Sequence, residues 1–239
     1  MHEPLSDRDR DLHSDLDRDR HPDPFRLATL DALRTVYRQP SQVVIDKERT
    51  AIDPATQQFL ERCRFAVVGT FDADGNPDTS PRGGDSGFVR VLDQHHIAVA
   101  DLGGNNRLDT LQNIVASGRV AFVFVMPGKS ETVRVNGDAW ITTDPDVLAR
   151  FELPRTPKTA IVCAIQTTYV HCAKAFHRSG MWDPTVWSEL ADAPDGADIL
   201  SCQLDAQFTP QDLRGFLDED YDAALAFERS SETVGETAD

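Results

Sequence analysis

The sequence contains no run of apolar residues that approaches the roughly 20 needed to cross a lipid bilayer. The residues after Met1 alternate aspartate with arginine and lack the apolar core of a signal peptide. Basic residues are also scarce, since 24 Lys and Arg stand against 40 Asp and Glu. Nucleic-acid binding requires a basic face. We therefore expect a cytoplasmic protein that binds neither a membrane nor nucleic acid.

Closely spaced cysteines are missing as well. The chain has four cysteines and no C-x-x-C pair: Cys63, Cys163, Cys172 and Cys202. This usage is typical of free thiols in a reducing compartment rather than of a disulfide framework. The spacing of His171, Cys172 and His177 matches no common metal site, so we predict no metal.

The sequence carries its excess of acidic residues at its two ends. Residues 1–24 hold eight acidic and four basic side chains, and residues 192–239 hold thirteen acidic side chains and two arginines. The middle is nearly neutral and has enough apolar residues for a core. We divide the chain into a disordered tail at 1–24, N-terminal helices at 25–62, a β-rich domain at 63–190, an acidic helical extension at 191–229 and a frayed tail at 230–239.

Hydrophobic periodicity predicts short strands with helices around them. Helical spacing indicates a helix from Asp23-Pro24 to Tyr37, and Asp53 is a good cap for a second helix. Thr209-Pro210 begins a C-terminal helix whose apolar stripe needs a partner surface. Strands are expected at 65–71, 87–92, 95–100, 119–126, 132–142 and 159–170, and further helices at 106–117 and 145–151. Five or six antiparallel strands favour a small closed barrel of the mainly β, α+β class, because closure removes exposed edges.

A glycine-rich loop precedes the helix expected at 106–117. It reads Gly103-Gly104-Asn105-Asn106-Arg107, so free backbone amides, the positive end of a helix dipole and a guanidinium would converge. That combination predicts an anion site suited to a phosphate. The same residues are also ordinary turn chemistry, and their spacing alone does not decide between the two interpretations.

Many short motifs follow one another in order along the chain. They are Thr70, Gly75-Asn76-Pro77, Ser80-Pro81-Arg82-Gly83, Gly87 to Asp93, Gly104 to Asp109, Asn113-Ile114, Pro127-Gly128, Glu131 to Gly137, and His171-Cys172-x-Lys174-Ala175-x-x-Arg178-Ser179-x-x-Trp182-Asp183-Pro184. With these motifs in this order, the sequence resembles the pyridoxamine 5'-phosphate oxidase-like flavoproteins over about residues 25–227. Within them it is similar to the branch of predicted flavin-nucleotide-binding proteins.

The resemblance implies an FMN-binding split β-barrel at 63–190 and a homodimer with one flavin in each of two clefts between subunits. By this resemblance, the residues along the isoalloxazine ring and ribityl chain would be Ser80, Pro81, Arg82 and Gly83. Ala100 and Asp101 would follow at the end of the next strand. Asn105, Asn106 and Arg107 would lie at the phosphate. Thr132 would approach the flavin from the other subunit. Lys174 and Arg178 would lie where the family's C-terminal segment reaches the flavin.

Two segments depart from the oxidases that act on pyridoxamine phosphate. Those enzymes carry a basic strand motif ending in lysine and an aromatic and basic C-terminal signature, where this chain has Ser80 to Asp85 and His171 to Lys174. The vitamin B6 reaction is therefore not expected. We predict an FMN-dependent oxidoreductase acting on a small organic substrate, with no catalytic residue identified. The alternatives are a non-catalytic flavin-binding redox carrier and a reductase that uses the deazaflavin F420 on the same barrel.

Overall fold

The computed structural model of the protein describes residues 23–230. Residue contacts divide the chain into two compact units, one ending at Ile45 and the other beginning at Asp46. The expected N-terminal tail lies outside the described residues apart from positions 23 and 24, and the expected C-terminal tail lies outside them apart from position 230.

The first unit holds the start of the N-terminal helical segment. Helix α2 (Leu30–Val36) begins where the Thr29 hydroxyl accepts a hydrogen bond from the Ala32 amide at 3.1 Å. That cap satisfies one of the free amides of the first turn, so the helix begins later than the expected start at Asp23-Pro24. A short helix α3 (Gln42–Asp46) follows.

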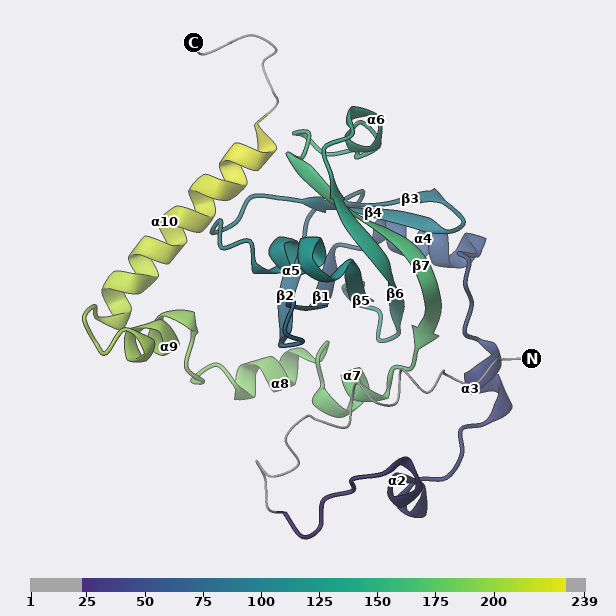
Figure 1. Ribbon diagram of the computed structural model, residues 1–239. Helices are drawn as coiled ribbons and strands as arrows, with labels where there is room; N and C mark the ends of the chain where they lie inside the picture. The colour runs from purple at the N-terminus through teal and green to yellow at the C-terminus, as the bar shows by residue number, and fades with distance from the viewer. Residues whose placement is uncertain (1–22, 231–239) are drawn as a thin grey trace. The chain divides into compact units, whose positions relative to one another are not determined.

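A seven-stranded antiparallel sheet organises the second unit (Figure 1). Its strands are β1 (Phe65–Phe71), β2 (Pro77–Gly83), β3 (Val89–Asp93), β4 (His96–Asp101), β5 (Arg119–Val125), β6 (Thr132–Thr142) and β7 (Thr159–His171). Its helices are α4 (Pro54–Arg62), α5 (Asp109–Ser117), α6 (Pro145–Leu148), α7 (Lys174–Ser179), α8 (Pro184–Glu189), α9 (Gly196–Gln203) and α10 (Pro210–Arg229). The expected caps are confirmed, because Asp53 accepts hydrogen bonds at the start of α4 and Thr209 does so at the start of α10.

The sheet curls without closing through hydrogen bonds. Its strand order is β2-β1-β5-β6-β7-β4-β3, and no ladder joins the two end strands within residues 23–230. Strands β2 and β4 stand far apart in this order, yet the Nε of Arg82 on β2 lies 3.8 Å from Oδ1 of Asp101 at the end of β4. A curled, open sheet therefore takes the place of the expected closed barrel, and side chains rather than backbone bridge the gap.

Strand β2 was not expected as a strand. Its sequence is polar, and its side chains alternate between exposed and half-buried without a buried face. Pro77 and Pro81 are tolerated because β2 is an edge strand paired with β1 alone. The residues predicted to contact the cofactor ring, Ser80 to Gly83, therefore lie on a regular edge strand.

The hydrophobic core fills the concave side of the sheet. Helix α5 lies against strands β1, β2, β5 and β6 (Figure 1). Phe122 and Phe124 of β5 are fully buried and stack with ring centroids 5.2 Å apart. Cys63 and Cys163 are buried free thiols, whereas Cys172 and Cys202 are exposed. Among the described residues, no helix has the length and apolar character to cross a membrane.

The ladder between β6 and β7 contains a close backbone approach at Gly137. The register shifts between Asn136 and Gly137. A Cβ atom added at Gly137 would overlap the carbonyl oxygen of Ala164 and lie 2.9 Å from Sγ of Cys163. Only glycine fits this position without moving the neighbouring strand.

We therefore predict that Gly137→Ala destabilises the protein by about 1–3 kcal/mol or more, because overpacking forces the two strands apart. Denaturant unfolding followed by circular dichroism measures the change. The matched control is Gly215→Ala on α10, where an added Cβ meets nothing within 4 Å. That control should be neutral or stabilising by up to about 1 kcal/mol, because alanine favours helix. An unchanged midpoint for Gly137→Ala would contradict the packing described here.

Candidate functional site

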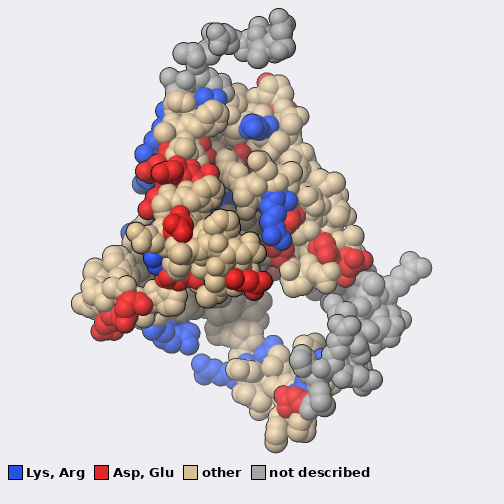
Figure 2. Space-filling model, turned by 90° about the vertical axis from the view of Figure 1, so that its left-hand side faces the viewer, with Lys and Arg blue, Asp and Glu red and all other residues tan. Residues whose placement is uncertain are grey.

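A cavity of about 850 Å³ opens beside strand β2. Its walls come from β2, the end of β4, the loop 102–108 with the start of α5, the loop 153–158 and the end of α10. Small-molecule sites run from about 300 to 1,000 Å³, so the volume suits a cofactor. The face of the molecule in Figure 2 shows acidic and basic side chains interleaved rather than gathered into a basic patch.

The cavity brings together nine of the twelve expected cofactor-binding residues. They are Ser80, Pro81, Arg82, Gly83, Ala100, Asp101, Asn105, Asn106 and Arg107. The other three do not line it. Thr132 is buried as the first residue of β6, opposite His171 on β7. Lys174 and Arg178 lie exposed on α7.

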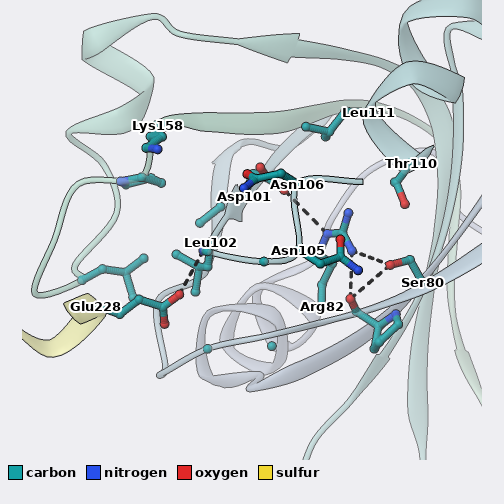
Figure 3. A pocket seen from close by; sticks show the side chains of 18 of the residues that line it. Ser80, Arg82, Asp101, Leu102, Asn105, Asn106, Thr110, Leu111, Lys158 and Glu228 are labelled. Carbon is teal, nitrogen blue, oxygen red and sulfur yellow. Dashed lines mark hydrogen bonds and ion pairs between the residues drawn. The ribbon is translucent and has the colours of Figure 1, made fainter. Parts of the chain in front are cut away.

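The Arg82 guanidinium is held at the centre of the cavity wall. Its Nη1 donates to the Ser80 hydroxyl at 2.6 Å and to the Pro81 carbonyl oxygen at 2.9 Å (Figure 3). Its Nε is buried and has no hydrogen-bond partner among the described residues. Buried polar groups nearly always have a partner, so this N–H is a place where a ligand oxygen or nitrogen could accept a hydrogen bond.

Asp101 faces Arg82 across the curl of the sheet. Burial raises the pKa of the Asp101 carboxyl above its ordinary value, and the Arg82 guanidinium and the Thr159 hydroxyl lower it only in part. Thr159 stands opposite Asp101 in the ladder between β4 and β7. The cavity therefore holds a carboxyl that keeps its proton to a higher pH than an exposed aspartate does.

Helix α5 begins at Asp109, three residues later than expected. Asn106 and Leu108 adopt left-handed backbone angles, with φ of 58° and 62°, and such residues break a helical run. Leu108 is the N-cap residue, and no side chain within residues 23–230 caps the helix. The first amides of α5 are therefore left without a side-chain acceptor at the cavity, where Thr110 and Leu111 also lie (Figure 3).

Arg107 therefore lies before the helix and not in its first turn. Its amide donates to the Asn105 side-chain oxygen at 3.0 Å, and its Nε donates to Oδ2 of Asp109 at 2.5 Å. The side chain is 77% exposed. The acid Asp109 occupies the first turn, so an anion bound there would compete with a carboxylate for Arg107.

The structure adds residues to the site that the sequence did not point to. Arg64 and Asp85 form an ion pair at one wall. Lys158 lies on the loop 153–158, and Glu228 reaches the cavity from α10 (Figure 3). Glu228 contacts a residue 125 positions away, and no local pattern marks such a contact. Among the described residues, no three His, Cys, Asp or Glu side chains gather as a metal site.

A comparison with known proteins identifies one matching family. The family model described as pyridoxamine 5'-phosphate oxidase matches residues 52–172, about half of the chain. None of the curated proteins matches the chain.

Several solved structures resemble parts of the chain. HupZ of Group A Streptococcus is 20% identical over 50% of this chain and 93% of its own, with a TM-score of 0.40. An F420 reductase is 17% identical over 50% of this chain and 98% of its own, at 0.36. The FAD binding protein of Mycobacterium smegmatis is 16% identical over 51% of this chain and 98% of its own, at 0.35.

Proposed function

Because the chain belongs to the pyridoxamine 5'-phosphate oxidase family, we propose that it is an oxidoreductase that binds FMN in the cavity beside β2. The observation that carries the proposal is a buried guanidinium N–H, on Nε of Arg82, that has no hydrogen-bond partner among the described residues. The same cavity holds the start of α5, which no side chain of the described residues caps. The first suits the acceptor atoms of a flavin ring, and the second suits a phosphate.

The residues of β2 and β4 would hold the ring end of the cofactor. Ser80 to Gly83 would run along the isoalloxazine ring and the ribityl chain, with Ala100 and Asp101 beside them. Arg82 is held by the Ser80 hydroxyl, and its Nε lies 3.8 Å from Oδ1 of Asp101. This Nε has no hydrogen-bond partner among the described residues and would donate to the ring. Asp101, whose pKa burial raises above its ordinary value, would lie beside the ring at that end.

The loop 102–108 and the start of α5 would hold the phosphate end. Asn105, Asn106 and Arg107 line this part of the cavity. Backbone amides at a helix start bind anions, and a guanidinium adds charge-assisted hydrogen bonds. The bound flavin would supply the hydride or electron transfer to a small organic substrate, while the protein orients it and shields it from water.

This proposal is tested by purifying the chain, adding FMN and recording the absorption spectrum. We expect one FMN per chain, a flavin spectrum, reduction by a nicotinamide cofactor and reoxidation by an organic acceptor. Tight binding without turnover would favour a redox carrier instead. A deazaflavin spectrum in the purified protein, with no affinity for FMN, would replace FMN by F420.

Arg107→Ala should weaken FMN binding about tenfold to a hundredfold, because a hydrogen bond to a charged group contributes ~1.5–3 kcal/mol. Riboflavin lacks the phosphate, so its affinity should change much less. Arg82→Ala should weaken both ligands, because Arg82 is assigned to the ring. Fluorescence titration of each variant with both flavins measures the difference.

The control for this comparison is Arg119→Ala. Arg119 is also an exposed arginine paired with an aspartate, Asp138, but it does not line the cavity. It should bind both flavins as the parent does. Equal losses of FMN and riboflavin in Arg107→Ala, or no loss of either, would contradict the phosphate assignment.

We also propose that the protein forms a homodimer with the flavin at the subunit interface. Lys174 and Arg178 are exposed and do not line the cavity of their own chain, so they would reach the flavin only from a second chain. Thr132 does not line the cavity either, and within its own chain it is buried. Exposed apolar side chains on α10, such as Phe216 and Tyr221, offer surface for a partner subunit.

Sedimentation of the flavin-loaded protein should show a stable dimer. Lys174→Ala should weaken FMN binding, although Lys174 does not line the cavity of its own chain. The comparison is Lys158→Ala, which removes a lysine from the cavity wall of the same chain. A stable monomer that retains flavin would rule out the shared site.

A further inference from the structure

The end of helix α10 places a carboxylate on the glycine-rich loop. Oε1 of Glu228 accepts a hydrogen bond from the Gly103 amide at 2.9 Å (Figure 3). Glu228 is half-buried, whereas the other residues from 221 to 230 are exposed. Glu228 lines the cavity together with its neighbours at the end of α10.

The loop 153–158 holds the end of α10 in this position. The Arg155 guanidinium lies 4.1 Å from the ring centroid of Phe227, and its Nη2 donates to the Ser230 hydroxyl at 3.2 Å. These contacts flank Glu228 on both sides along the chain. The carboxylate is therefore presented to Gly103 by an anchored helix end and not by a free side chain.

Glycine at position 103 makes this approach possible. A Cβ added there would lie 3.0 Å from Oε1 of Glu228. An exposed backbone amide in a glycine-rich loop is also the group that binds phosphate oxygens. The same loop continues into Asn105, Asn106 and Arg107, which line the cavity with Glu228.

We propose that the Gly103 amide is an anion-binding group to which the Glu228 carboxylate is bound in this structure. A phosphate-bearing cofactor displaces this carboxylate together with the end of α10. This inference rests on the proposed binding of FMN for the identity of the ligand. One amide hydrogen cannot serve two anions fully, and a carboxylate beside a phosphate is repelled. Glu228 therefore competes with the cofactor's phosphate for the Gly103 amide and lowers the apparent affinity for a phosphate-bearing ligand.

The experiment compares Glu228→Ala and Glu228→Gln with the parent. Inorganic phosphate is titrated while the Gly103 amide is followed by NMR, and FMN and riboflavin are titrated by fluorescence. Glu228→Ala should bind phosphate and FMN about tenfold more tightly, because a competing charged hydrogen bond is removed. Riboflavin should bind unchanged. Glu228→Gln keeps an acceptor without the charge and should lie between the two.

The matched control is Glu219→Ala, which removes the same charge from an exposed position on α10 that does not line the cavity. It should behave as the parent with all three ligands. Unchanged or weaker binding of both phosphate and FMN in the Glu228 variants would overturn the proposal and make the contact a structural support of the loop.

The two proposals fail in different ways. If neither the parent nor the variants bind FMN, but Glu228→Ala still binds inorganic phosphate more tightly at Gly103, the flavin proposal fails and the displacement proposal stands. If the parent binds FMN as expected and the Glu228 variants match it with FMN and phosphate, the displacement proposal alone fails. Glu228→Gln preserves the shape of the side chain and so guards against a general loss of folding.

Discussion

The curl of the seven-stranded sheet is the constraint on which the candidate site depends. Arg82 and Asp101 lie on strands that four others separate in the sheet order, and they meet only because the sheet bends back on itself. In the ladder between β6 and β7, the two longest strands of the sheet, Gly137 lets the two backbones approach.

Charge in the cavity is arranged in neighbouring pairs. Arg64 lies against Asp85, Arg82 faces Asp101, and Arg107 binds Asp109. Only the Arg82 pair is mostly buried. The Arg64 and Arg107 side chains are 54% and 77% exposed, so their ion pairs contribute little to stability. The pairing also means that an anionic ligand that binds one of these arginines competes with a carboxylate that is already in place. Glu228 likewise pairs a carboxylate with a donor in the cavity wall, which here is the backbone amide of Gly103.

The sequence predicted local structure well where local signals decide it. Strands at 65–71 and 132–142 have the expected bounds, because their apolar residues are distinctive. The caps Asp53 and Thr209 act as expected, since a cap binds amides two or three residues away. Prediction failed for β2, a polar edge strand, and for the start of α5, where left-handed residues in the loop delay the helix.

By itself the sequence determined the family, the antiparallel character of the sheet and nine of the residues that line the cavity. These follow from the order of its motifs and from periodicities that each segment carries on its own. Only the tertiary structure decided that the sheet stays open, that Nε of Arg82 is buried without a hydrogen-bond partner among the described residues, and that Glu228 accepts from the Gly103 amide. Those features are contacts between segments distant in sequence, and they arise from how the buried faces pack together, which no local pattern encodes.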